Sequence, residues 1–201
     1  MNLNNITENL LVVDFTEYHK NHPAEVLPSN GVMFVEQPDS RLGAFCILNP
    51  NHIPYEAINL EENKNLVTDK SGNSVKQCEC ICRAHRENGR RWVLLLELKY
   101  CNEDNIPANM QNALHKLEKC YEFLHIEKNF FEDNPYHIYL CASHPEHDTA
   151  KPFGEFIYNQ NKLLELNDKG IKFLYCNAVK ILTPEYLMKS TIPHKYQYIK
   201  P

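Results

Sequence analysis

The order of apolar and polar residues predicts that the chain begins with a helix and two strands. Apolar residues recur at loosely helical spacing over residues 6–20, and Pro23 limits any continuation, so we expect a first helix there. Residues 32–37 and 43–49 are predicted strands, because two apolar runs flank a Pro-Asp-Ser turn signal. Residues 50–74 are polar and turn-rich, and the segment LVTDKSGNSV at their end predicts a tight hairpin.

The rest of the chain predicts a long hairpin followed by alternating helices and strands. After Pro107, apolar residues from Met110 to Leu124 recur every three or four positions with Lys and Glu between them, which indicates an amphipathic helix. In chain order, the predicted elements are strands at 74–84 and 91–101, this helix, a strand at 137–143, a helix at about 154–167, a strand at 171–176 and a basic, Tyr-rich tail over 186–201. This order predicts an α+β fold with a mixed central sheet flanked by helices, and a mixed α/β sandwich is the alternative.

Composition and charge indicate a compact protein without an overall attraction for polyanions. The 201 residues are 43% hydrophobic and 23% charged, with a formal net charge of -5. Apolar surface of this extent offsets the entropy of ordering, so we expect a single domain over residues 1–201. The N-terminus lacks the features of a signal peptide, and the longest strongly apolar run, WVLLLEL, is too short to cross a bilayer. We therefore expect a cytoplasmic protein that does not bind membranes and keeps its eight cysteines reduced.

The long hairpin allows a prediction of register. A three-residue loop that ends in Gly89, with this glycine at positive φ, makes the numbers of every cross-strand pair sum to 176. Glu79 then lies directly opposite Glu97. Gln77 lies opposite Lys99 on the same face. The other face would hold Cys78, Cys80 and Cys82 together with Leu94, Leu96 and Leu98. We therefore expect one apolar face and one charged face.

The facing carboxylates of Glu79 and Glu97 predict a metal site. Two carboxylates directly opposite each other repel unless a positive charge lies between them. Hard oxygen ligands suit Mg²⁺ or Mn²⁺, and Lys99 on the same face could orient or deprotonate a metal-activated water. The alternative is a solvated strand face, where polar residues are normal. A second acid-x-Lys triplet, Glu62-Asn63-Lys64, shows that only the context of the triplet is informative.

The chain has an acidic residue, about twenty residues later a Glu-x-Lys at the end of an apolar strand, and then a helix. This order resembles the PD-(D/E)xK nuclease superfamily. The resemblance implies a restriction-endonuclease-like αβββαβ core over about residues 6–143, with a helix and strand extension at 150–201. The implied activity is metal-dependent hydrolysis of phosphodiester bonds, in DNA more than in RNA.

The resemblance also implies a role for individual residues. Glu79, Glu97 and the carbonyl of Leu98 would bind the metal, and Lys99 would assist the attacking water. The sequence departs from the superfamily pattern because no Pro-Asp precedes the tripeptide, and the first acidic ligand lies instead in the sequence CECIC.

Further site residues are implied on the two helices. Some superfamily members place another acidic residue on the first helix, where Glu8 and Glu17 are both candidates. Many members carry a polar residue that faces the site on the helix after the tripeptide. Gln111 and His115 lie one turn apart and off the apolar stripe of this helix, so both are candidates for that role.

Four of the five arginines fall at or beside the tip of the long hairpin: Arg83, Arg86, Arg90 and Arg91. Such a patch could contact nucleic-acid phosphates. A solubilising hairpin tip is the alternative. A second hypothesis for function follows, namely a non-catalytic protein that keeps a nuclease-like fold and binds a partner or nucleic acid through this hairpin.

Cys141, His144 and His147 could contribute to a zinc site, because they form a C-x2-H-x2-H cluster after a strand. A fourth ligand at matching spacing is missing from the sequence. A buried cysteine followed by two loop histidines is therefore the favoured interpretation.

Overall fold

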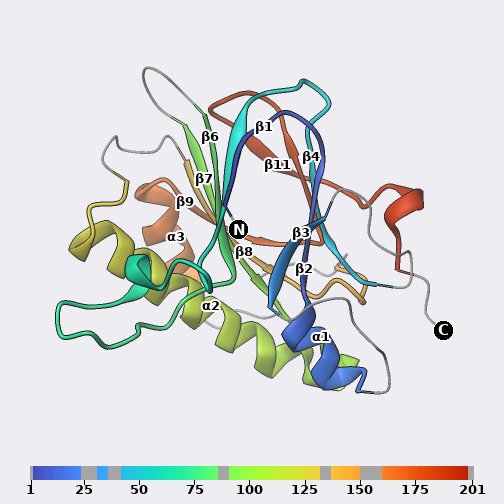
Figure 1. The fold of residues 1–201 in the computed structure, drawn as a ribbon, viewed down its shortest axis with the longest axis horizontal. Coiled ribbons are helices and arrows are strands. Elements are labelled where there is room, and N and C mark those ends of the chain that lie inside the picture. The colour runs from blue at the N-terminus through green and yellow to red at the C-terminus, as the bar shows by residue number, and fades with distance from the viewer. Residues whose placement is uncertain are drawn as a thin grey trace.

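Two mixed β-sheets form most of the chain that the structure describes. The structure is a computed structural model and describes residues 2–23, 31–35, 42–85, 91–131, 137–149 and 160–198. The six-stranded sheet has the order β1-β5-β6-β7-β8-β9, and the five-stranded sheet has the order β11-β10-β4-β2-β3 (Figure 1). The predicted α+β class is confirmed.

The strands are short and the helices few. In sheet order, the six strands are β1 (Asn2–Ile6), β5 (Tyr55–Asn59), β6 (Cys80–Ala84), β7 (Trp92–Leu98), β8 (His137–Ser143) and β9 (Ile171–Tyr175). The five strands are β11 (Leu187–Lys189), β10 (Ala178–Ile181), β4 (Phe45–Leu48), β2 (Leu10–Asp14) and β3 (Val32–Val35). The α-helices are α1 (Phe15–Asn21), α2 (Ile106–Glu122), which continues as a π-helical turn (Phe123–Glu127), and α3 (Gln160–Asp168). Across the described residues, no helix combines the length and the apolar character that a bilayer crossing needs.

The six-stranded sheet changes from antiparallel to parallel pairing at β7. Strands β1, β5, β6 and β7 pair antiparallel in succession, whereas β7, β8 and β9 run parallel. Parallel neighbours need a crossover connection, and α2 lies in the one between β7 and β8. The carboxyl ends of β7, β8 and β9 therefore meet at one edge of the sheet.

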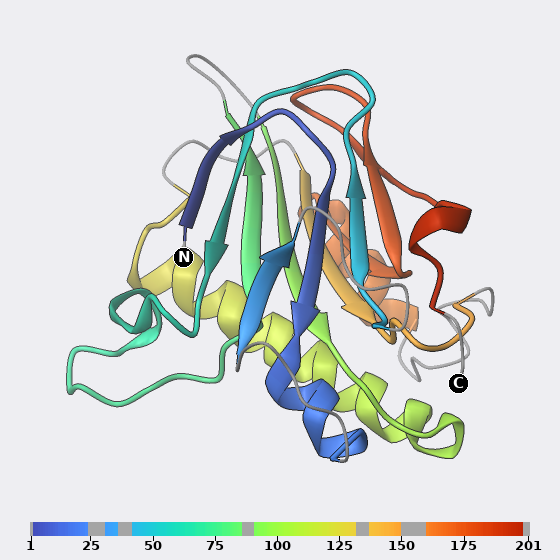
Figure 2. The same cartoon turned by 45° about the vertical axis from the view of Figure 1, so that its right-hand side comes forward.

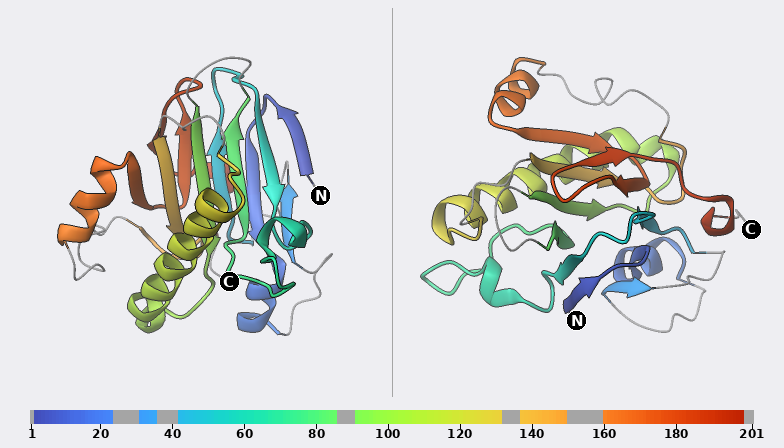
Figure 3. Two further views of the ribbon diagram at one scale, coloured as in Figure 1. Left: turned by 90° about the vertical axis from the view of Figure 1, so that its left-hand side faces the viewer. Right: turned by 90° about the horizontal axis from the view of Figure 1, so that it is seen from above.

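The two faces of β7 enter two different apolar layers. Leu94 and Leu96 belong to a layer between the sheets that also contains Phe45 of β4. Leu95 belongs to the layer beneath α2, together with Met110. The left panel of Figure 3 shows α2 lying across this outer face of the sheet, and Figure 2 shows β1 of one sheet leading through a short arc into β2 of the other. Because both faces are covered, β7 is buried along its whole length, which accounts for its continuous apolar sequence.

The first predicted helix is wrong over its first part, where the structure has a strand. β2 occupies this segment, and α1 starts only at Phe15. Residues 10–13 are all buried, and a continuous apolar run of this kind fits a strand that is covered on both faces better than an amphipathic helix. Asp14 ends the strand and caps the helix, since its side chain accepts a hydrogen bond from the N–H of Glu17 at 3.0 Å.

Most of the other predicted elements are confirmed. The helix after Pro107 is α2, and the strand at 137–143 is β8. A bridge between Thr68 and Ser74 closes the predicted tight hairpin. The sequence pattern misses four strands, namely β1, β5, β10 and β11. These short strands are defined by pairing with neighbours on one or both sides rather than by long apolar runs. The predicted helix at 154–167 is observed from Gln160 onward, and its earlier part falls outside the described residues.

The predicted register of the long hairpin is confirmed over residues 80–83, and its loop lies outside the described residues. The predicted pairs of Glu79 with Glu97 and of Gln77 with Lys99 are wrong, because β6 begins only at Cys80. Cys80 pairs with Leu96, and Cys82 pairs with Leu94. The expectation of one apolar and one charged face is wrong, because α2 covers the second face as well. The place expected for Cys78 is also wrong. The chain bends at Glu79, whose N–H donates to the carbonyl of Leu96 at 2.9 Å, one residue out of the regular ladder, and Cys78 joins the layer beneath α2.

Candidate active site

Acidic and basic side chains from four parts of the fold converge at the end of β7. Glu97 is the last residue but one of this strand, and Lys99 follows the strand. Glu79 lies at the bend before β6, Glu17 on α1 and Lys116 on α2. Helices α1 and α2 lie at the same end of the two sheets in Figure 1.

Glu97 is at the centre of this group and is 0% exposed. Its Oε1 contacts two ammonium groups, Nζ of Lys99 and Nζ of Lys116, each at 2.7 Å. Among the described residues, its Oε2 has no hydrogen-bond partner. A buried acceptor without a partner is costly, so this oxygen is the atom of the site that gains most from a ligand.

The charges alternate in sign across the site. Nζ of Lys116 also lies 4.0 Å from Oε1 of Glu79. Nζ of Lys99 lies 4.0 Å from Oε2 of Glu17. The series therefore runs Glu79, Lys116, Glu97, Lys99 and Glu17, and we call these five residues the charged cluster. Three acids against two lysines leave the fully ionised cluster with an excess negative charge, which favours a further cation.

The environment shifts the protonation of Glu79 and Lys116 in the same direction. Burial raises the pKa of Glu79 well above its usual range, and the charges of Glu97 and Asp14 raise it further, against the opposing effect of the lysines. Burial lowers the pKa of Lys116, but the carboxylates of Glu97 and Glu79 outweigh it and raise this pKa above its usual value. The cluster thus keeps Lys116 charged, while Glu79 favours its protonated form.

Asp14 is a further buried carboxyl beside the charged cluster. Burial raises its pKa to about 6, and the charges of Glu61 and Glu17 add to this rise, whereas the cap hydrogen bond and Lys99 oppose it. Asp14 is not among the site residues predicted from the sequence. An Asp three residues before a Glu at the start of a helix is a capping signal that could have identified it.

Three predicted site residues, Glu79, Glu97 and Lys99, are brought together by the fold. Of the two acidic candidates on the first predicted helix, Glu17 lies in the charged cluster. Glu8 instead has a side chain that is 74% exposed and lies 3.3 Å from His52.

Lys116 is the cluster member that sequence reasoning missed. It lies on α2 next to Leu117, at the border of the buried stripe. That border position is the only signal in the sequence, since any lysine there could equally extend into solvent.

The other predicted site residues lie elsewhere. Gln111 and His115 are exposed on α2. Arg83 is paired with Glu56, and its guanidinium lies over the ring of Phe130 at 4.9 Å from the centroid.

Arg83 and Arg91, the arginines within the described residues, do not adjoin the charged cluster. Arg83 and Arg91 lie at the opposite end of β6 and β7 from Glu79 and Lys99. At about 3.3 Å per residue, this puts Arg91 roughly 20 Å from Glu97. Arg86 and Arg90 fall outside the described residues.

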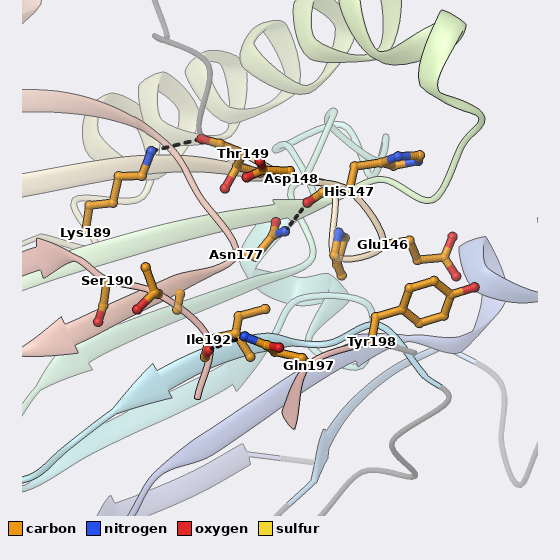
Figure 4. A pocket seen from close by; sticks show the side chains of 13 residues that line it. Glu146, His147, Asp148, Thr149, Asn177, Lys189, Ser190, Ile192, Gln197 and Tyr198 are labelled. Atoms are coloured by element: carbon orange, nitrogen blue, oxygen red, sulfur yellow. Dashed lines mark hydrogen bonds between the residues drawn. The ribbon is translucent and has the colours of Figure 1, made fainter. Parts of the chain in front are cut away.

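A polar pocket of about 450 Å³ lies at the ends of β8 and β9 (Figure 4). Its walls come from the loop 145–149, from Asn177, and from residues 189–192 and 197–198. Two contacts tie this loop to the neighbourhood of the charged cluster. His147 contacts the carbonyl of Cys101, and Glu146 pairs with His22 after α1 at 2.8 Å.

The structure places Cys141 in β8, and His144 and His147 in the loop that follows this strand. Cys141 lies 3.8 Å from Cys176, sulfur to sulfur. His144 is fully buried and packs edge-on against Tyr175. Over the described ranges, no three His, Cys, Asp or Glu side chains are grouped so as to hold a metal ion.

The charged cluster nevertheless fits a cation of the Mg²⁺ type. Mg²⁺ is usually held by one or two carboxylates, with waters and substrate phosphates completing its coordination. Glu79 and Glu97 are such a pair, because each has its Oε1 within 4.0 Å of the same Lys116 ammonium. Within the described part of the chain, Oε2 of Glu97 is a buried oxygen still free to bind.

Comparisons of the chain with protein-family models, with curated proteins and with solved structures gave no match.

Proposed function

We propose that the protein is a nuclease that hydrolyses phosphodiester bonds of DNA with Mg²⁺ or Mn²⁺. The observation that supports this most is the convergence of Glu79, Glu97 and Lys99 in one buried cluster. The strand order adds support. Antiparallel β5, β6 and β7, then α2, then parallel β8 is an order that fits the resemblance to PD-(D/E)xK nucleases.

Glu79 and Glu97 would hold the cation, with the carbonyl of Leu98 as a further ligand. When bound, the cation supplies positive charge to the phosphate oxygens and makes a bound water more acidic. Lys99 is positioned by Glu97 at 2.7 Å and Glu17 at 4.0 Å, and its side chain is only 11% exposed. An ammonium fixed in this way donates a hydrogen bond to the attacking water or to a phosphate oxygen.

The nucleic acid would approach the end of β7 from the edge where α1 and the loop 145–149 lie. Arg83 and Arg91 are too distant to contact the same phosphate as Lys99. Any contact of Arg83 or Arg91 with nucleic acid would be with another part of a long substrate, and at Arg83 it would compete with Glu56 and Phe130.

Cleavage assays on supercoiled plasmid and on labelled single-stranded DNA test this function. With Mn²⁺ present, we expect activity that falls by at least about 10²-fold in Glu97→Gln and in Lys99→Met, since each loses a group that acts on the reacting atoms. The matched controls are Glu62→Gln and Lys64→Met, which alter the other acid-x-Lys triplet. Circular dichroism checks that each variant is folded. Equal cleavage by all four variants would remove the charged cluster from the reaction.

A second function is favoured by one observation, the position of Lys116. Its ammonium contacts Glu97 at 2.7 Å and lies 4.0 Å from Glu79, so the pair of acids has a counter-charge without any metal. This suits a non-catalytic protein that retains a nuclease-like fold and binds a partner. It predicts that Mn²⁺ neither binds nor raises the melting temperature of the wild-type protein.

A further inference from the structure

Lys116 and Lys99 contact the same oxygen of Glu97, yet they sit differently in the fold. Both Nζ atoms lie 2.7 Å from Oε1 of Glu97. Lys116 alone also lies near Glu79, at 4.0 Å, so its ammonium is placed between the two carboxylates proposed to hold the metal. Lys99 lies instead between Glu97 and Glu17.

The two lysines also differ in their freedom to move. The side chain of Lys99 is 11% exposed and follows β7 directly, whereas that of Lys116 is 36% exposed and comes from the surface of α2. Lys116 can turn into solvent without opening either apolar layer, because its long stem lies at the border of the buried stripe. A withdrawal of Lys116 leaves Oε1 of Glu97 still bound to Lys99.

We propose that Lys116 is a built-in counter-cation that occupies the place of the divalent ion between Glu79 and Glu97 and leaves it when the ion binds. This inference rests on the metal site of the proposed function. Two positive charges cannot share so small a buried space at low cost, since charges interact strongly where water is excluded. Lys116 thereby stabilises the acids in the metal-free protein and weakens the binding of metal.

The consequence is an opposite effect of Lys116 on stability and on metal affinity. Lys116→Met removes the charge and keeps most of the apolar stem, so the metal-free protein should melt at a lower temperature and bind Mn²⁺ at least about tenfold more tightly. Lys116→Arg keeps the charge and should show no gain in affinity. The matched control is Lys119→Met, which removes an exposed lysine of the same helix that pairs with Glu122.

Titration calorimetry with MnCl₂, together with melting curves with and without Mn²⁺, tests the inference without any measurement of activity. Tighter binding by Lys116→Met, with Lys116→Arg and Lys119→Met no tighter than wild type, supports it. Equal or weaker binding of Mn²⁺ by Lys116→Met overturns the inference. The proposed function still stands in that case if the wild-type protein binds Mn²⁺ and the Glu97→Gln variant does not. Lys116→Gln repeats the comparison should the methionine variant fold poorly.

Two further outcomes separate this inference from the proposed function. If Lys116→Met binds Mn²⁺ and the wild-type protein does not, the result supports Lys116 as the group that occupies the place between Glu79 and Glu97. The same result overturns the proposal of a metal-dependent nuclease. An absence of binding in both proteins overturns the inference and the proposed function together.

Discussion

The charged cluster and the polar pocket beside it satisfy their polar groups in different ways. In the pocket, side chains form hydrogen bonds with backbone carbonyls and with each other. Asn177 donates to the carbonyl of His147 at 2.7 Å and accepts from Ser143 at 2.8 Å, and Lys189 donates to the carbonyl of Thr149 at 3.0 Å. In the charged cluster, acidic and basic side chains face one another, and a carboxyl oxygen of Glu97 has no partner within the described residues.

This difference separates polar groups that stabilise the fold from polar groups whose burial destabilises it. A side chain that binds a backbone carbonyl fixes a loop, so its removal should destabilise the protein. A buried carboxyl surrounded by like charges is destabilising in its ionised form, so its neutralisation should stabilise the protein. Opposite signs of the change in stability are therefore expected from the two regions.

Asp14→Asn should give the largest change in stability and the one with the most informative sign. The folded-state pKa of Asp14 is raised to about 6 from an ordinary value of 3.8, so between these values the folded state binds more protons than the unfolded state. The free energy of unfolding of the wild-type protein therefore loses a contribution as pH rises from about 4 to 6. Asn removes this loss and can still cap α1. Above pH 6, the variant should be more stable by up to about 3 kcal/mol.

Urea denaturation of both proteins at several pH values measures this difference. The gain should vanish below pH 4, where Asp14 is protonated in both states. Asp69→Asn is the control with the opposite sign, because hydrogen bonds from the backbone and side chain of Asn73 and from the N–H of Ser71 lower the pKa of this turn residue. A stability difference between Asp14→Asn and the wild-type protein that does not vary with pH would contradict the comparison.

The same contrast explains which parts of the site were predictable from the sequence. Glu79 and Glu97 could be predicted to lie at the same end of the hairpin because a hairpin places its two strands side by side, although the bend at Glu79 takes this residue out of the regular ladder. Lys116 and Asp14 reach the site through packing of α2 and of the second sheet. No local pattern specifies such contacts between elements distant in the chain.

The same distinction between local and long-range order applies to the fold. The continuous apolar sequence of β7 and the periodic stripe of α2 are strong local signals, and both elements are observed where expected. Strands β5 and β10 have no such signal, because pairing with strands from other parts of the chain defines them. The run at residues 10–13 shows the opposite failure, since its loose helical spacing was outweighed by burial on both faces.

Asn177→Ala should have a smaller effect, and one of opposite sign. The change removes two hydrogen bonds of Asn177, one to the loop 145–149 and one to Ser143 of β8, so we expect a loss of about 2 kcal/mol in the free energy of unfolding. The proposed cleavage of DNA should persist, because the charged cluster is untouched. Asn51→Ala is the matched control, since this exposed side chain makes one hydrogen bond, to the carbonyl of Leu182, and its loss should change stability by no more than about 0.5 kcal/mol. If Asn177→Ala instead stabilised the protein, burial of polar groups in the pocket would also be destabilising.

Arg83→Gln should have the smallest effect, because this cation already has its partners in the folded protein. Arg83 pairs with Glu56 and lies over the ring of Phe130, in the manner of the satisfied groups of the pocket. A phosphate would have to compete with both, so we expect the affinity for DNA to change by less than about twofold and its dependence on salt to be unaltered. Each phosphate contact contributes about one unit to the slope of log affinity against log salt, which makes the slope a direct test. Glu56→Gln sharpens it, since release of Arg83 from its carboxylate should strengthen binding and steepen the slope. If Arg83→Gln alone made the slope shallower by about one, Arg83 would contact a phosphate of the DNA despite its partners in the fold.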